Sequence, residues 1–306
     1  MLSWSTIMNN EKSSAIPASP IDFKSVARAL TVVENDLEGS NELLKGLTFK
    51  KEVPVIGITG PPGAGKSTLV NALIGSLLTG GNKIAVLAID PTSPFNFGSL
   101  LGDRIRIAPF FNHPDVFIRS LATRGSLGGL SAKTVEMTDV LRAAGFDYVL
   151  IETVGVGQSE VEIAGLADIT FLVLVPEGGD EIQNIKSGLM EIADAYIINK
   201  ADRPDADLFA NNLKKILGQS GANGKQPVFK TIASKGEGVG QLTDFIAEQS
   251  FTLNKRKKLL TAERAWQIIR QRRMADIDKK RLAADLDDAS AKPGFNLYSF
   301  LEKYLI

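Results

Sequence analysis

One eight-residue stretch constrains the fold of this chain more than any other feature. Residues 60–67 read GPPGAGKS and fit the pattern G-x-x-x-x-G-K-[ST]. They lie between an apolar, β-branched run at 53–59 and a segment with helical patterning at 66–79. A glycine-rich loop between a strand and a helix turns its backbone N–H groups toward a phosphate, and the amino end of the helix adds positive potential. The sequence therefore predicts a nucleotide phosphate-binding loop.

The residue types in this loop match that chemistry. Lys66 would supply a point charge near the β- and γ-phosphates, and the Ser67 hydroxyl would be a ligand of Mg²⁺. The alternative, a chance glycine-rich turn, is disfavoured by the strand–loop–helix context. The predicted nucleotide-binding residues are Gly60, Pro61, Pro62, Gly63, Ala64, Gly65, Lys66, Ser67 and Thr68.

The rest of the central sequence alternates short hydrophobic runs with helical segments. Strands are predicted at 53–59, 83–90, 146–152, 169–175, 195–199 and 227–233. Helices are predicted at 66–79, 131–144, 181–193, 205–218 and 238–249. Near-continuous hydrophobicity is typical of strands covered on both faces. The sequence therefore predicts an α/β fold of the P-loop NTPase type, with a mostly parallel, doubly wound sheet flanked by helices.

Helical extensions are expected at both ends of this domain. We predict an N-terminal extension at 1–50, a GTPase domain at 51–250 and a C-terminal dimerisation segment at 251–306. The first extension should begin a helix at Asp22, and Asn41 should cap a second short helix. The C-terminal segment carries an apolar helical face that would pack a homodimer: Leu259, Ala262, Trp266 and Ile269.

Composition excludes several other classes of protein. The 306 residues include no Cys and one His, His113, which excludes disulfides, Cys-based zinc sites and multi-His metal centres. The 35 basic and 35 acidic residues balance, which argues against a nucleic-acid partner. No apolar run is long enough to span a membrane, so we expect a cytoplasmic protein with no membrane contact. His113 is expected in a turn, with no catalytic role.

Acidic residues at the ends of predicted strands are candidate metal ligands. Asp90 ends the second strand and Glu152 the third, and Asp103 lies between them. With Ser67 these carboxylates suit Mg²⁺, although an acid at a strand end can also simply cap a turn. Glu152-Thr153-Val154-Gly155 occupies the place where many regulatory GTPases carry D-x-x-G.

Two further residues belong to this predicted switch. The small Gly155 would let its amide approach a γ-phosphate. Gln158, close to the switch in sequence, is a candidate to orient the attacking water. The predicted catalytic residues are thus Lys66, Glu152 and Gln158.

A second motif predicts which base is bound. Asn199-Lys200-Ala201-Asp202 matches N-K-x-D. A carboxylate at Asp202 can accept two hydrogen bonds from guanine N1–H and the N2 amino group, whereas adenine offers no such pair. Ser234 and Lys235 would complete the base pocket. The sequence therefore predicts binding of GTP and GDP.

These segments together resemble the MeaB/ArgK family, the GTPases associated with cobalamin-dependent acyl-CoA mutases and formerly labelled LAO/AO transport system ATPases. The resemblance is carried by GITGPPGAGKST, VLAIDPTSPFNFGSLLGDRIR, FIRSLATRGSLGGLS, IETVGVGQSE, PEGGDEIQNIKSGLMEIAD and INKAD, between residues 57 and 202. In this family Glu152 is the expected residue at its position.

The resemblance implies a homodimeric GTPase, and the predicted metal ligands make its activity Mg²⁺-dependent. It would bind methylmalonyl-CoA mutase or a relative, gate loading of adenosylcobalamin and protect the mutase from inactivation. It also implies an extra switch at 178–188, with Asp180, Gln183 and Lys186 as sensors; the residues alone suggest only a solvated helix start. Three arginines are candidates to supply charge during hydrolysis: Arg104, Arg119 and Arg124.

Two other functions remain as alternatives. A metallochaperone GTPase delivering nickel or cobalt would need Cys or His ligands, which this chain nearly lacks. An ATP-dependent kinase of a transport-binding protein is disfavoured by N-K-x-D.

Overall fold

The computed structural model describes residues 21–90, 108–122, 132–153, 159–177, 193–219 and 226–249, and, with single-residue and two-residue gaps, residues 261–304. The chain divides into two compact units, Met1–Leu260 and Thr261–Ile306. The predicted helix at 181–193 lies outside the described residues except for its last position. The predicted boundaries at residues 50 and 250 remain predictions.

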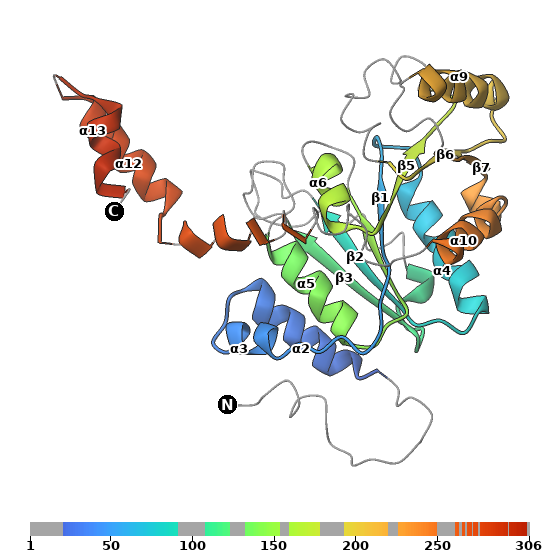
Figure 1. Cartoon of the computed structure of the whole chain (residues 1–306), viewed down its shortest axis with the longest axis horizontal. Helices are drawn as coiled ribbons and strands as arrows, with labels where there is room; N and C mark the ends of the chain where they lie inside the picture. Colours follow the sequence, from blue (N-terminus) through green and yellow to red (C-terminus); the bar gives the residue numbers. More distant parts are fainter. Residues whose placement is uncertain are drawn as a thin grey trace, which may run out of the picture. The chain divides into compact units, whose positions relative to one another are not determined.

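The first unit is built on a parallel sheet with strand order β3-β2-β4-β1-β5-β6-β7 (Figure 1). Its strands are β1 (Val55–Thr59), β2 (Ile84–Asp90), β3 (Val116–Ala122), β4 (Tyr148–Glu152), β5 (Ile169–Leu174), β6 (Ala195–Asn199) and β7 (Val228–Thr231). Every pairing among them is parallel. The predicted fold class and all six predicted strands are confirmed. Strand β3 was not predicted; it is an edge strand whose run of apolar residues is interrupted by Arg119 and Ser120.

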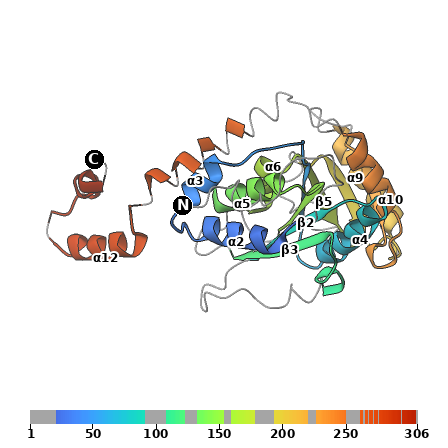
Figure 2. The ribbon, with the colours of Figure 1, turned by 90° about the horizontal axis from the view of Figure 1, so that it is seen from below.

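Helices cover both faces of this sheet (Figure 2). The structure has α4 (Lys66–Thr79), α5 (Ala132–Ala143), α6 (Ser159–Leu166), α9 (Ala206–Gln219) and α10 (Val239–Glu248). Four of these were predicted, and α4 has the predicted limits. The prediction omitted α6, which is only eight residues long.

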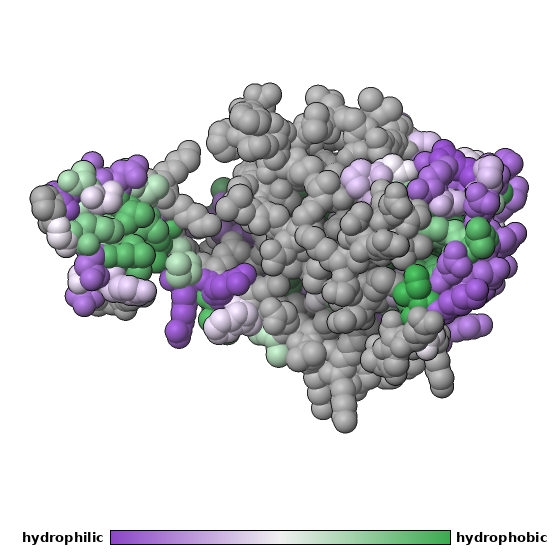
Figure 3. All heavy atoms as spheres, turned by 90° about the horizontal axis from the view of Figure 1, so that it is seen from above, coloured by the Kyte–Doolittle hydropathy of each residue, from purple (hydrophilic) through white to green (hydrophobic). Residues whose placement is uncertain are grey.

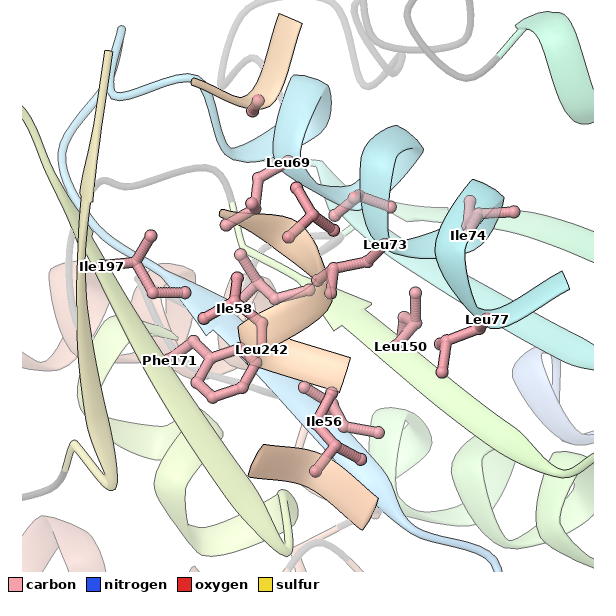
Figure 4. Close-up of a cluster of buried hydrophobic side chains, with 14 of the residues drawn as sticks. Ile56, Ile58, Leu69, Leu73, Ile74, Leu77, Leu150, Phe171, Ile197 and Leu242 are labelled. Carbon is pink, nitrogen blue, oxygen red and sulfur yellow. The ribbon is translucent and has the colours of Figure 1, made fainter. Parts of the chain in front are cut away.

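Alternate residues of each strand point to opposite faces of the sheet, and both faces are apolar because helices cover both. Phe171 and Val173 of β5 pack in one cluster with α4 and α10 (Figure 4). Leu172 and Leu174 pack instead with α9, through Phe209, Leu213 and Leu217. The central strands are therefore buried on both sides, and their carboxyl ends form one edge of the sheet.

The first described helix packs against α5, and Phe23 at its start contacts Phe117 of the edge strand β3. Helix α2 (Phe23–Glu34) begins after Asp22, as predicted. The Asp22 side chain accepts a hydrogen bond from the Lys24 amide. Three rings hold α2 in place, with centroid separations of 5.5–6.0 Å: Phe23, Phe117 and Phe146.

The predicted cap of the second helix is wrong. Helix α3 (Ser40–Lys45) contains Asn41 in its first turn, and the residue before the helix is Gly39. Gly39 has a φ of 87°, so it makes the left-handed turn into the helix that a side chain would strain.

The second unit contains α12 (Lys279–Ser290) and α13 (Leu297–Leu301). None of its described side chains is buried, and hydrophobic residues gather on its surface (Figure 3). The centroid of the Phe300 ring lies 6.1 Å from that of Phe295 and 5.7 Å from that of Tyr304. Within the described part of the whole chain, no helix is long and apolar enough to cross a membrane.

Candidate functional site

The phosphate-binding loop joins the carboxyl end of β1 to the first turn of α4. Gly60, at the start of the loop, has a φ of 137°, and a Cβ there would lie 2.2 Å from the Val173 carbonyl oxygen. Gly65, just before α4, has a φ of 84°, and a Cβ there would lie 2.4 Å from Asn199 Nδ2. Only glycine fits at either position. These two glycines set how closely β5 and the Asn199 side chain approach the loop.

Lys66 is held over this loop. Its side chain is buried, and Nζ donates to the carbonyl oxygens of Gly60 at 2.7 Å and Pro61 at 2.9 Å. A buried ammonium needs such acceptors to offset the loss of hydration. Because Lys66 is also the first residue of α4, its charge lies at the helix end that favours anions.

Ser67 and Glu152 meet at the edge of the sheet. The Ser67 hydroxyl donates to Glu152 Oε1 at 2.6 Å. Strand register places Glu152 beside Ile58 of β1 and Ala88 of β2. The next residue, Thr153, fixes this end of β4, because its hydroxyl donates to Thr59 Oγ1 at 3.0 Å.

The oxygens of Ser67 and Glu152 suit a hard cation such as Mg²⁺. Among the described side chains, no group of three or more His, Cys, Asp or Glu residues is placed to hold a metal. Asp90 ends β2 as predicted, but its side chain lies outside the described residues, as do Asp103, Gly155 and Gln158. The four predicted metal ligands therefore remain a prediction, which the Ser67–Glu152 contact supports.

Asn199 connects two loops of the site. Its Nδ2 donates to the Ala64 carbonyl oxygen at 2.9 Å, and its Oδ1 accepts from the Thr231 hydroxyl and the Ala233 amide, both at 3.1 Å. The residue is almost completely buried. Asn199 thus ties the phosphate-binding loop to the segment that follows β7.

Lys200 crosses the same loop. Its backbone has a φ of 57°, and its Nζ donates to the Gly63 carbonyl oxygen at 2.8 Å. The stem of the side chain therefore extends alongside the phosphate-binding loop, as expected for a residue that covers the base.

A pocket of about 250 Å³ opens where these segments meet. It is lined by Gly65, Thr68, Asn199, Lys200, Asp202, Arg203, Ile232, Ala233 and Ser234. The structure thus brings together parts of all three predicted nucleotide-binding segments. Lys235 lies in the same short 3-10 helix as Ser234 but is not among the lining residues.

Sequence reasoning missed Arg203, Ile232 and Ala233. Ile232 and Ala233 directly precede the predicted Ser234, and Arg203 directly follows the predicted Asp202. Their position beside predicted site residues was the only sequence signal that could have identified them. Arg203 forms an ion pair with Glu177, which follows β5. The pKa of Glu177 is below its usual range because its own backbone amide and the Arg203 guanidinium both donate to its carboxylate.

Other predicted residues lie away from this pocket or outside the described residues. Arg119 donates to Glu34 of α2 at 2.5 Å, so its charge is already paired there. His113 lies in the turn before β3, as predicted, and its Nδ1 accepts from the Asp115 amide. The remaining candidates are outside the described residues: Arg104, Arg124, Asp180, Gln183 and Lys186.

Comparisons with known proteins agree with this geometry. The family described as methylmalonyl Co-A mutase-associated GTPase MeaB matches residues 26–286. A protein of Pyrococcus horikoshii named as a GTPase is 45% identical over 250 residues, covering 79% of this chain and 78% of that protein. The mitochondrial methylmalonic aciduria type A homologue of Mus musculus is 39% identical over 210 residues, covering 67% of this chain and 49% of that protein.

One solved structure has a similar fold over nearly the whole length. It is described as a LAO/AO transport system kinase, and it superposes with a TM-score of 0.64 at 24% identity. The match covers 94% of this chain and 95% of the other. At this identity the likeness shows a shared fold.

Proposed function

Because this chain belongs to the MeaB family of methylmalonyl-CoA mutase-associated GTPases, we propose that it gates adenosylcobalamin loading on a cobalamin-dependent acyl-CoA mutase. The enzyme partner would be methylmalonyl-CoA mutase or a relative, which the chain would also protect from inactivation. GTP binding and hydrolysis would time both actions. The pocket shared by the phosphate-binding loop and the N-K-x-D residues is the observation that supports nucleotide binding, and the family match supports the mutase partner.

The described residues suggest how hydrolysis proceeds. Phosphoryl transfer depends mainly on positioning and charge neutralisation. Lys66 and the loop amides would hold the phosphates, while Glu152 positions the Ser67 hydroxyl. Bound Mg²⁺ would neutralise phosphate charge, held by Ser67, Asp90, Asp103 and Glu152 directly or through water. Gln158 is the proposed group that orients the attacking water.

The proposed role of Asp202 in base selection has a direct test. In Asp202→Asn the side chain gains an N–H donor and loses an acceptor, so it would suit the C2 carbonyl of xanthine. We expect GTP affinity to fall by about 100-fold or more, and XTP to bind better than GTP. Asp244→Asn, on the exposed side of α10, is the control. Unchanged GTP preference in Asp202→Asn would show that another residue reads the base.

The proposed partner is tested with purified methylmalonyl-CoA mutase. The chain should co-elute with the mutase in a nucleotide-dependent way, and the mutase should raise its GTP hydrolysis rate. Cobalamin loading, followed by absorbance, should differ between GDP and a non-hydrolysable GTP analogue. A hydrolysis rate that the mutase leaves unchanged would contradict the gating proposal.

We also propose that residues 251–306 mediate homodimerisation. Trp266 and Ile269, on the predicted apolar face, are 58% and 49% exposed. Such side chains gain from burial against a partner. Light scattering at micromolar concentration should give the dimer mass, and a monomer mass would overturn this proposal.

A further inference from the structure

Arg203 lines the predicted base pocket although it lies outside the N-K-x-D motif. Its backbone amide donates to the Lys200 carbonyl oxygen at 3.0 Å, closing a turn between the two residues. Both cationic side chains therefore belong to the same short turn and line the same pocket. Lys200 donates a hydrogen bond to the Gly63 carbonyl oxygen of the phosphate-binding loop, whereas Arg203 forms an ion pair with Glu177.

The contact with Glu177 leaves the guanidinium accessible. The Arg203 and Glu177 side chains are 44% and 51% exposed. A guanidinium is planar: its edge N–H groups bind carboxylates, while its two faces remain free to stack on flat rings. One Arg203 side chain can therefore bind Glu177 through its edge and a purine ring through its face.

The rest of the pocket lacks a flat group of this kind. Its described lining includes no Phe, Tyr, Trp or His side chain. Proteins commonly bind exposed bases by stacking them on aromatic rings or arginine planes. Within the described lining, Arg203 is the side chain with a planar surface of that size.

We propose that Arg203 stacks on the purine ring of the bound nucleotide and that Glu177 braces its guanidinium in that position. This inference rests on the proposed assignment of the pocket to the guanine base. It adds a residue that strengthens binding without reading the edge of the base. Selection of guanine stays with Asp202.

The test compares nucleotide affinities of Arg203 variants by fluorescence titration with mant-labelled GDP and competition by unlabelled GDP and IDP. Arg203→Ala should weaken GDP and IDP by a similar factor of about 10. Arg203→Lys keeps the charge but loses the plane, so it should behave like Arg203→Ala. Lys51→Ala removes one charge from an exposed ion pair elsewhere in the chain and is the matched control.

Glu177 is tested by a double-mutant cycle. Glu177→Gln should weaken GDP binding by about two- to five-fold, and the double variant should bind no more weakly than Arg203→Ala alone, because the brace acts only through Arg203. Additive losses would overturn the bracing role. Thermal unfolding of each nucleotide-free variant should match the parent protein, which separates a pocket effect from misfolding.

Two further results would overturn the stacking role. Parent-like affinity in Arg203→Lys would mean that charge alone matters, and parent-like affinity in Arg203→Ala would mean that the residue is not used. If the parent chain itself binds no GDP, the base-pocket assignment fails as well. The outcomes thus distinguish failure of this inference from failure of the proposed function.

Discussion

The Ser67 hydroxyl donates a 2.6 Å hydrogen bond to Glu152 Oε1, joining the first turn of α4 to the carboxyl end of β4. The contact links the loop that would bind phosphate to the start of the predicted switch. It also brings two predicted Mg²⁺ ligands, 85 residues apart in sequence, within hydrogen-bond distance.

Removing the charge of Glu152 tests this pair. Glu152→Gln keeps an oxygen that can accept from Ser67 but lowers the negative charge available to a cation. We expect the Mg²⁺ concentration needed for half-maximal GTP binding to rise by about 10- to 100-fold, measured by titrating Mg²⁺ against a fluorescent GTP analogue. Glu248→Gln, exposed on α10, should leave it unchanged. The same Mg²⁺ dependence in both variants would remove Glu152 from the proposed metal site.

We expect the protein to lose stability when the hydrogen bonds of the Asn199 side chain are removed. Asn199→Ala leaves the buried Thr231 hydroxyl and the Ala233 amide without their acceptor. We expect the free energy of unfolding to fall by about 2–4 kcal/mol, since each unsatisfied buried group costs about 1–3 kcal/mol. Urea unfolding measures this change. Asn211→Ala, exposed on α9, is the control and should change stability by less than about 0.5 kcal/mol.

Much of this architecture was predictable because its signals are local. The start of α4 follows from residues 60–67, where glycines, a lysine and a serine stand between a strand and a helix. Strands β1, β5 and β6, in which every residue is buried, are recognisable because burial on both faces leaves few polar residues in a strand. Strand β3 escaped prediction because an edge strand tolerates polar residues such as Arg119.

The contacts that build the site depend on tertiary structure. Nothing in the sequence shows that Asn199 reaches Ala64, 135 residues away, or that Arg203 pairs with Glu177. The prediction that Asn41 caps α3 was also wrong. The helix begins after Gly39, whose left-handed backbone makes the turn without a capping side chain, so Asn41 lies inside the helix. Sequence motifs therefore predicted which segments meet, while the partners of individual side chains required the structure.

Gly57 of β1 lies against α6 and should not tolerate a larger residue. A Cβ there would come within 2.8 Å of Ile163 and 2.9 Å of Ala167. We expect Gly57→Ala to lower the free energy of unfolding by about 1–3 kcal/mol through overpacking. Gly75→Ala in α4 is the matched control: its Cβ would meet only Phe110, at 3.9 Å, so it should stabilise by about 0.5–1 kcal/mol. Equal effects of the two changes in urea unfolding would contradict this packing account.

Because Tyr196 is buried, we expect the protein to become less stable at alkaline pH. Burial raises the pKa of Tyr196 to about 12, from 10.0. Between these values the unfolded chain loses the phenolic proton while the folded chain keeps it, so rising pH favours unfolding. At pH 11 the loss should be about 1.4 kcal/mol relative to pH 8, because one pKa unit corresponds to about 1.4 kcal/mol.

The measurement compares Tyr196→Phe with the parent chain by urea unfolding from pH 8 to pH 11. The variant also lacks the hydroxyl itself, so the two proteins are compared by their change with pH rather than by absolute stability. The free energy of unfolding of Tyr196→Phe should fall less steeply above pH 10 than that of the parent chain. Tyr298 is 81% exposed, so Tyr298→Phe should follow the parent chain. Parallel curves for the parent chain and Tyr196→Phe would mean that the folded state admits the charged phenolate, and β6 would then be more open to water than its burial indicates.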